Sequence, residues 1–196
     1  MKRILDFILA LILLLLSLPL WLIVIPLILI FSGSPPFFSH ERVGLNGKSI
    51  KIIKFRSMRR SRAEEPRITV EGDRRVTKIG NILRKTKVDE IPQLLNILKG
   101  DMSFVGPRPE VPEYVAGYDD QQREILNYRP GLVDPATLKY RNEESILADF
   151  DNPQEAYVGK ILPDKIRLSL DYQHNRNIFT DFMVIMRTFG ALFQKR

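Results

Sequence analysis

An uncharged apolar segment near the start of the chain constrains the fold more than any other feature. The 25 residues from Phe7 to Phe31 carry no charged side chain, and only Ser17, Pro19 and Pro26 interrupt a run of leucine and isoleucine. As a helix this segment would be roughly 37 Å long, enough to cross a hydrocarbon core about 30 Å thick. The sequence therefore predicts a membrane helix. A secretory signal peptide fits less well, because the apolar region is too long and no small-residue cleavage site follows it.

Two features favour a re-entrant helix, which enters and leaves by the cytoplasmic face, over a spanning helix. Pro19 removes a backbone donor near the middle of the segment, and the Ser17 hydroxyl can bond to a carbonyl that is left free. Basic residues lie on both sides of the segment, so a spanning helix would leave one basic group outside. We therefore predict a helix-break-helix in residues 1–34 and a cytoplasmic, membrane-associated catalytic domain in residues 35–196, with a spanning helix as the alternative.

The charge of the chain is as uneven as its hydropathy. The formal net charge is +7, but residues 42–87 alone carry 15 basic and 4 acidic side chains. A basic block behind a membrane segment fits the acidic headgroups of a phospholipid bilayer. Nucleic acid is not predicted as a partner, because Phe55 is the only aromatic residue of this block. The absence of cysteine excludes disulfides and a thiolate zinc site.

A small hairpin is predicted just after the membrane segment. Residues 37–43 and 49–55 flank Asn46 and Gly47, a pair typical of a tight hairpin turn. Helical spacing of apolar residues follows, and one such helix is expected to end at Gly100.

The C-terminal residues also show helical spacing. Apolar side chains recur from Ile178 to Phe193, as in a helix that faces the core or, alternatively, one that lies on a bilayer. The predicted fold class is α-dominant α+β, with a re-entrant membrane helix, a small β-hairpin and amphipathic interfacial helices.

Adjacent carboxylates at Asp89 and Glu90 form the candidate reactive centre. Proline is tolerated in the first turn of a helix, so Pro92 places a helix start close to Asp89. The helix dipole stabilises negative charge there, and we expect Asp89 to be ionised. Because acidic residues at helix starts are often only caps, the neighbouring residues decide between the two interpretations.

Basic residues lie on both sides of this acidic pair. Arg84 and two lysines precede it, and the rigid turn Gly106-Pro107-Arg108-Pro109 follows it. An arginine fork suits phosphate oxygens, and prolines fix the backbone that carries it. Together with the carboxylates, these residues indicate phosphate chemistry assisted by Mg2+, a cation that prefers one or two carboxylates and substrate phosphates.

Three motifs carry a family resemblance: Lys54-Phe55-Arg56-Ser57-Met58, the run from Val88 to Ser103, and Val105-Gly106-Pro107-Arg108-Pro109. Together they resemble the bacterial sugar transferase family, the monotopic polyprenyl-phosphate phosphoglycosyl transferases. The resemblance covers nearly the whole chain and is to the minimal catalytic-core type. Ser17 and Pro19 match the membrane break of the family, although a leucine separates them here.

The resemblance implies an enzyme that works at a membrane surface. A member of the family transfers a sugar 1-phosphate from a nucleotide sugar, usually a UDP-sugar, to undecaprenyl phosphate and releases UMP. The reaction uses Mg2+ and a covalent aspartyl phospho-sugar intermediate. It is the first membrane step of surface glycan synthesis, such as exopolysaccharide or lipopolysaccharide, at the cytoplasmic face of the bacterial inner membrane. The sugar, the pathway and the oligomeric state, a homodimer included, are left open.

The resemblance also implies roles for individual residues. Asp89 takes the position of the nucleophile and of the metal ligand. Glu90 takes the position of the acid that helps to activate the lipid phosphate. Pro107, Arg108 and Pro109 take the positions of the nucleotide-sugar binding site. The other candidate substrate-binding residues are basic: Lys54, Arg56, Arg84, Arg129 and Arg141.

The segment 130–144 departs from the pattern of many family members. It resembles a second subgroup with a Lys-Tyr-Arg-Asn-Glu-Glu run, and Asp134 stands where a small residue is usual. An additional carboxylate facing a phosphate would be costly. Either Asp134 points away from the substrate, or the substrate pocket differs.

Two other functions fit the same sequence. The chain could be a catalytically inert membrane-anchored scaffold, or it could bind an anionic partner through its basic block. UMP release that depends on Asp89 would distinguish the enzyme from both.

Overall fold

The computed structural model describes residues 2–59, 69–70 and 72–193, and helices predominate there. The chain forms two compact units. The first contains residues Met1–His40 and Lys51–Gly100, and the second contains Glu41–Ile50 and Asp101–Arg196. The predicted boundary at residue 34, between a membrane segment and a cytoplasmic domain, is a different division and stays a prediction.

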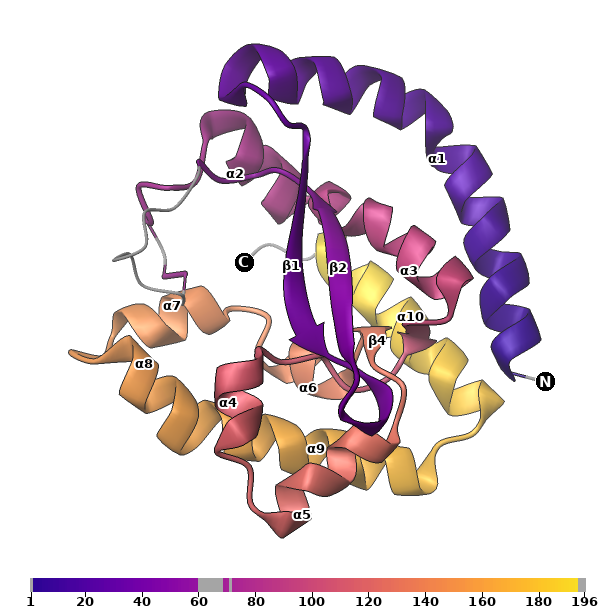
Figure 1. Ribbon diagram of the computed structural model, residues 1–196, viewed down its shortest axis with the longest axis vertical. Helices are drawn as coiled ribbons and strands as arrows, with labels where there is room; N and C mark the ends of the chain where they lie inside the picture. The colour runs from indigo at the N-terminus through magenta and orange to yellow at the C-terminus, as the bar shows by residue number, and fades with distance from the viewer. Residues whose placement is uncertain (1, 60–68, 71, 194–196) are drawn as a thin grey trace. The chain divides into compact units, whose positions relative to one another are not determined.

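The secondary structure confirms an α-dominant α+β fold with a small antiparallel hairpin (Figure 1). The hairpin strands are β1 (Phe37–Val43) and β2 (Ser49–Phe55), joined by the 3₁₀ turn η1 (Leu45–Gly47). The helical elements of the first unit are α1 (Lys2–Ser32), α2 (Lys78–Lys85), the 3₁₀ helix η2 (Val88–Gln93) and α3 (Leu94–Lys99). Those of the second unit are α4 (Pro112–Ala116), α5 (Asp120–Arg123), η3 (Glu124–Asn127), α6 (Pro135–Lys139), α7 (Glu143–Ala148), α8 (Pro153–Ala156), the π-helix η4 (Tyr157–Ile161), α9 (Leu162–Asn175) and α10 (Ile178–Phe193).

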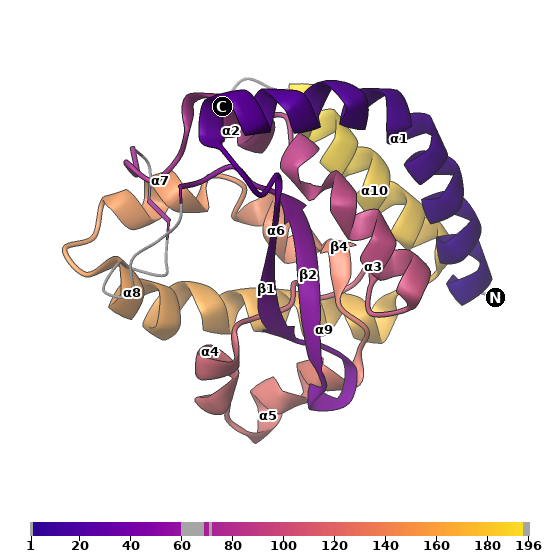
Figure 2. The same ribbon diagram turned by 45° about the horizontal axis from the view of Figure 1, so that its top comes forward.

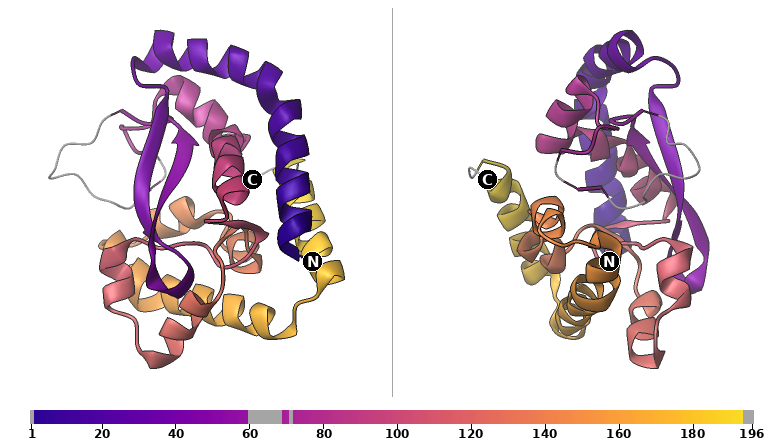
Figure 3. Two further views of the ribbon diagram at one scale, coloured as in Figure 1. Left: turned by 45° about the vertical axis from the view of Figure 1, so that its right-hand side comes forward. Right: turned by 90° about the vertical axis from the view of Figure 1, so that its left-hand side faces the viewer.

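Helix α1 is continuous and bends part-way along its length (Figures 1 and 3). Pro19 lies inside it, as predicted, and cannot donate to the carbonyl of Leu15. The Ser17 hydroxyl donates to the carbonyl of Leu14 (2.8 Å) and accepts from the indole N–H of Trp21 (3.1 Å). The predicted break is therefore a bend within an unbroken helix, and the serine bonds to the carbonyl next to the one that the proline leaves free.

The C-terminal half of α1 takes part in the core of the first unit. Val24 and Ile28 pack with Phe55 of β2 and Leu83 of α2 in one buried cluster. Most of the other apolar side chains of α1 are exposed, and its mean hydropathy over an 18-residue window is 3.0. A helix with this much exposed apolar surface is expected to need lipid around it.

Both ends of α1 are hydrogen-bonded to other elements of the first unit. Near the N-terminal end, Arg3 donates to the carbonyls of Ile97 and Leu98 (2.8 Å to Leu98) at the end of α3. At the C-terminal end, the Ser32 hydroxyl donates to Thr77 Oγ1 (3.0 Å), the residue that caps α2. Figure 2 shows α1 lying along α2 and α3, with which it is in contact.

The hairpin and α3 follow the sequence closely. Asn46 and Gly47 both have positive φ angles, 56° and 75°, as an Asn-Gly turn requires. Gly100 ends α3 in the left-handed conformation (φ 95°). The fully buried Asn96 of α3 donates to the carbonyl of Lys51 (2.7 Å) and accepts from the N–H of Ile53 (3.1 Å), which fixes β2 against α3.

The second unit contains a parallel strand pair that the sequence did not predict. β3 (Ser103–Val105) pairs with β4 (Gly131–Val133), with Ser103 opposite Gly131. Each strand has three residues, too few for a periodic pattern.

Helix α10 exposes its apolar stripe. Ile178, Phe179, Phe182, Met186 and Phe189 are all exposed, Phe179 by 70%. This exposure argues against the core-facing alternative for the stripe. Its placement on a bilayer surface stays a prediction.

Candidate active site

Asp89 and Glu90 lie at the start of η2, as predicted from Pro92. Lys87 caps η2 with a positive φ of 59°, and the chain turns sharply there from α2 into η2. The helix is 3₁₀ up to Gln93 and becomes α-helical at Leu94. The sharp turn places the two carboxylates close to β2 of the same unit.

The carboxyl group of Asp89 is buried. The residue is 5% exposed, and its Oδ1 has no hydrogen-bond partner among the residues that the structure describes. Burial raises the pKa of Asp89, while the charges of Lys54, Lys87 and Arg84 lower it in part. The expectation that the helix dipole controls the ionisation of Asp89 is therefore corrected. Desolvation is the largest effect, and η2 is too short for a large dipole.

Lys54 of β2 is a basic partner of the acidic pair. Its ammonium group lies 2.9 Å from Oε1 of Glu90, and both side chains are mostly buried. Lys54 is also the strongest of the charges that lower the pKa of Asp89. The ammonium group of Lys54 therefore interacts electrostatically with both carboxylates.

Arg56 follows directly after β2, and its surroundings differ from those of Lys54 on that strand. Its guanidinium donates to the carbonyls of Ser32, Gly33 and Ser34, at distances of 2.6 Å to Ser32 and 2.9 Å to Ser34. These carbonyls lie at the C-terminal end of α1, where a helix leaves its last acceptors unsatisfied. In this structure Arg56 caps α1, and its role in substrate binding stays a prediction.

Arg84, the third basic candidate of the first unit, is part of the electrostatic environment of Asp89. Its positive charge lowers the pKa of Asp89, and its Nη1 lies 3.6 Å from the sulfur of Met58. The first unit thus brings together Lys54, Arg84, Asp89 and Glu90.

The donor set of this site fits Mg2+ better than zinc. Within the described part of the chain no group of three or more His, Cys, Asp or Glu side chains could hold a metal ion. Zinc usually needs such a group, whereas Mg2+ binds through one or two carboxylates and keeps water or phosphate ligands. The buried carboxylate of Asp89 is a ligand group of the required kind.

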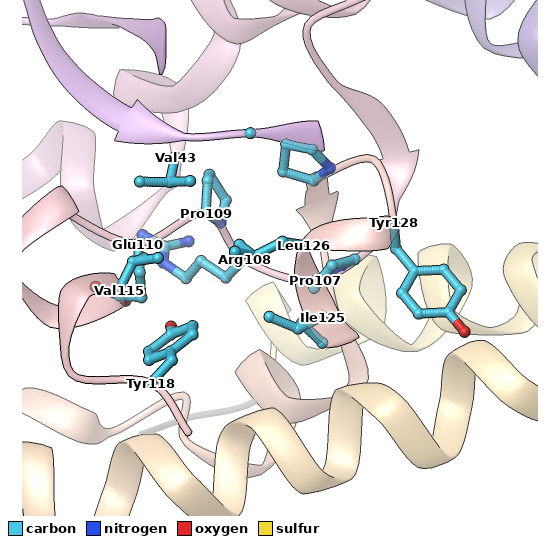
Figure 4. Close-up of a pocket in the computed structure, with 12 residues that line it drawn as sticks. Val43, Pro107, Arg108, Pro109, Glu110, Val115, Tyr118, Ile125, Leu126 and Tyr128 are labelled. Carbon is cyan, nitrogen blue, oxygen red and sulfur yellow. The ribbon is translucent and has the colours of Figure 1, made fainter. Parts of the chain in front are cut away.

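The Pro107-Arg108-Pro109 turn belongs to the second unit and lines a pocket there. In Figure 4, Arg108 and Pro109 point into the space between Val43 and Tyr118. Glu110 follows the turn and also lines the pocket, and its Oε1 accepts a hydrogen bond of 2.6 Å from the hydroxyl of Tyr157. The pocket is lined by one guanidinium and several ring surfaces.

The structure places the other two basic candidates apart from this pocket lining. Arg129 lies just before Pro130, and its buried Nε has no hydrogen-bond partner in the described residues. Arg141 lines a second, open pocket between α6 and α10, together with Lys139 and Arg187. Neither is among the residues that line the pocket around Arg108.

Asp134 is a residue whose position the sequence left undecided. It is 2% exposed, and its carboxylate accepts hydrogen bonds from the N–H of Ala136 (3.3 Å) and the hydroxyl of Ser169 (2.7 Å). Burial raises its pKa, and these hydrogen bonds lower it in part. Asp134 therefore points into the protein and caps α6. An Asp directly before a Pro at a helix start is the sequence signal for such a cap.

Known proteins match this chain over nearly its whole length. Residues 1–195 match the family model described as bacterial sugar transferase. The exopolysaccharide production protein ExoY of Rhizobium meliloti (strain 1021) is 33% identical over 97% of this chain and 84% of its own length. A UDP-glucose:undecaprenyl-phosphate glucose-1-phosphate transferase of Caulobacter vibrioides is 33% identical over 97% of this chain and 69% of its own. A UDP-N-acetylgalactosamine-undecaprenyl-phosphate N-acetylgalactosaminephosphotransferase of Aeromonas hydrophila is 34% identical over 97% of this chain and 43% of its own.

Proposed function

The chain belongs to the bacterial sugar transferase family, and from this premise we propose that it transfers a sugar 1-phosphate from a UDP-sugar to undecaprenyl phosphate and releases UMP. The observation that carries the proposal is the buried carboxylate of Asp89, which has one unpartnered oxygen and lies beside Lys54 and Glu90. An oxygen without a hydrogen-bond donor keeps its lone pairs available for a phosphorus atom.

In the proposed reaction, Asp89 attacks the phosphorus that carries the sugar. The bond from this phosphorus to the UMP oxygen breaks, UMP leaves, and the sugar phosphate stays on Asp89 as an acyl phosphate. An oxygen of undecaprenyl phosphate then attacks the same phosphorus and frees the Asp89 carboxylate. Lys54 and Arg84 offset the repulsion between the negatively charged reactants. In the second half of the reaction, Glu90 would assist the lipid phosphate.

Mg2+ is part of the proposal, with Asp89 as its protein ligand. When bound there, it would neutralise charge on the phosphate oxygens of the substrate.

UMP release from a panel of UDP-sugars tests the proposed function. With undecaprenyl phosphate as acceptor, we expect one UDP-sugar to be turned over well above the others, and we expect EDTA to abolish and Mg2+ to restore the reaction. The printed names of the relatives include glucose and N-acetylgalactosamine donors, which belong in the panel. Membrane association without UMP release from any donor would favour the inert scaffold or the anionic-partner protein instead.

We also propose that both ends of α1 lie on the cytoplasmic face of the inner membrane. Arg3 bonds to the end of α3, and Ser32 bonds to Thr77 at the start of α2. Residues Thr77 to Lys99 connect these two points. In the described residues α1 is the one helix long and apolar enough to cross a membrane, so the connecting residues supply no second crossing. These contacts support a re-entrant helix over a spanning one.

Cysteine labelling tests this topology. The chain contains no cysteine, so Lys2→Cys and Lys78→Cys each give a single thiol, one on each side of the apolar segment. In intact cells we expect both thiols to resist a membrane-impermeant maleimide, and in inverted membrane vesicles we expect both to react. Labelling of Lys2→Cys in intact cells, with Lys78→Cys protected, would establish a spanning helix.

A further inference from the structure

The Pro107-Arg108-Pro109 turn is held on its inner side by β4 and the residue after it. The N–H of Gly106 donates to the carbonyl of Val133 (3.1 Å), and the N–H of Gly131 donates to the carbonyl of Pro107 (2.9 Å). A carboxylate adds to these backbone bonds, because Oδ2 of Asp134 accepts from the N–H of Arg108 at 3.4 Å. The side chain of Asp134 thus reaches the backbone of the arginine itself.

Asp134 is in turn fixed by two further elements. Ser169 of α9 donates its hydroxyl to the same Oδ2 (2.7 Å), and the N–H of Ala136 in α6 donates to Oδ1 (3.3 Å). All three donors of this carboxylate therefore come from different parts of the second unit. A buried carboxylate with three donors has little freedom to move, so the N–H of Arg108 has a fixed acceptor.

The outer side of the turn is held by Glu110. Its carbonyl accepts from the N–H of Val43 (2.8 Å), and its carboxylate accepts from the Tyr157 hydroxyl (2.6 Å) and lies 3.8 Å from Arg42. The backbone on both sides of Arg108 is therefore anchored, and its side chain projects into the pocket from a fixed base (Figure 4).

We propose that Asp134 is a positioning residue for substrate binding: it fixes the backbone of Arg108 so that the guanidinium is held ready for a phosphate of the UDP-sugar. This inference rests on the proposed function of the chain. In this role the carboxylate of Asp134 does not touch the substrate. A direct contact with the substrate phosphates would be repulsive. A preoriented arginine loses less conformational entropy when it binds a phosphate. Asp134 is therefore expected to increase the affinity of the protein for the UDP-sugar.

Asp134→Ser separates positioning from folding. Serine is also a good helix N-cap, so the cap of α6 is retained, but its hydroxyl is too short to reach Arg108 and Ser169 together. We expect the KM for the best UDP-sugar of the panel to rise about 10-fold and kcat to change less than about 3-fold, and we expect the Kd for UDP, measured by calorimetry, to rise with KM. Asp134→Asn keeps one acceptor oxygen and should give an intermediate KM.

Matched variants distinguish positioning from a general loss of stability. Ser169→Ala removes a hydrogen bond from Asp134 but leaves its contact with Arg108, so it should lower the melting temperature with a KM within about 2-fold of the unmodified protein. Asp151→Ser makes the same substitution at an exposed aspartate and should change neither quantity. The positioning role is wrong if Asp134→Ser raises KM no more than Ser169→Ala does. It is also wrong if Asp134→Ser lowers kcat and leaves KM unchanged.

A double variant tests whether Asp134 acts through Arg108. In an Arg108→Gln background, Asp134→Ser should weaken UDP binding by less than about 2-fold further, because the guanidinium that it positions is absent. A full additional 10-fold loss would overturn the proposal. If the unmodified protein binds UDP but releases no UMP from any donor, the proposed function fails, and the UDP affinities of these variants still decide the role of Asp134. If Asp134→Ser does not fold, the KM and Kd of Asp134→Asn decide it by the same comparison.

Discussion

Asp89→Asn is expected to lower UMP release by roughly a thousand-fold or more, because an amide cannot act as the nucleophile that the proposed reaction requires. The substitution is nearly isosteric, and the side chain is buried with one oxygen unpartnered, so the fold should tolerate it. The measurement is UMP release with the best donor and undecaprenyl phosphate. Turnover that stays within a few-fold of the unmodified protein would show that Asp89 is not the nucleophile.

The covalent intermediate provides a second readout for the same variant. Without undecaprenyl phosphate, the unmodified protein should release about one UMP per active site and gain the mass of a sugar phosphate, which hydroxylamine should remove. Asp89→Asn should show neither effect. Glu90→Gln should still form the adduct but should pass it on to the lipid slowly. Asp151→Asn, at an exposed aspartate, is the matched control and should behave like the unmodified protein.

Gly131→Ala is expected to have a large effect on stability. A Cβ at this position would lie 2.1 Å from the backbone nitrogen of Gly106 and 2.5 Å from its carbonyl oxygen. These are backbone atoms that cannot rotate away, so β4 and the Pro107-Arg108-Pro109 turn would have to separate. We expect a loss of about 3 kcal/mol or more, equivalent to a fall of roughly 6–12 °C in melting temperature.

A glycine in open space provides the control for this variant. Nothing lies within 4 Å of a Cβ built at Gly159, in the exposed part of η4. Gly159→Ala should therefore leave the melting temperature unchanged or raise it slightly. Equal melting temperatures for the two variants would mean that the close approach of Gly131 to Gly106 does not hold the turn.

The sequence predicted those parts of the fold and site that short-range patterns determine. The two hairpin strands, the Asn46-Gly47 turn and the end of α3 at Gly100 follow from local backbone preferences. The helix start at Asp89 follows from Pro92 in the same way. In each of these cases the deciding interactions lie within a few residues of one another along the chain.

Interactions between distant residues were beyond the sequence patterns. Arg56 is one of several basic residues in a charged block, and only the packed fold determines that its donors meet the end of α1. The ionisation of Asp89 depends on its burial, which the sequence does not state. β3 and β4 are too short to show a sequence pattern. Asp134 directly follows β4, so its orientation depends on how the two strands pair.

The proposed re-entrant placement of the bent helix α1 has a consequence for the surrounding lipid. A helix that crosses the bilayer takes up area equally in both leaflets, whereas a bent helix with both ends tied to one set of soluble elements takes up area in the near leaflet alone. Each leaflet supplies only about half of a hydrocarbon core about 30 Å thick. In the proposed re-entrant placement, insertion of α1 would therefore act as a wedge that expands one leaflet. Packing stress between the leaflets, and not bilayer thickness alone, would then set how strongly α1 is held in the membrane.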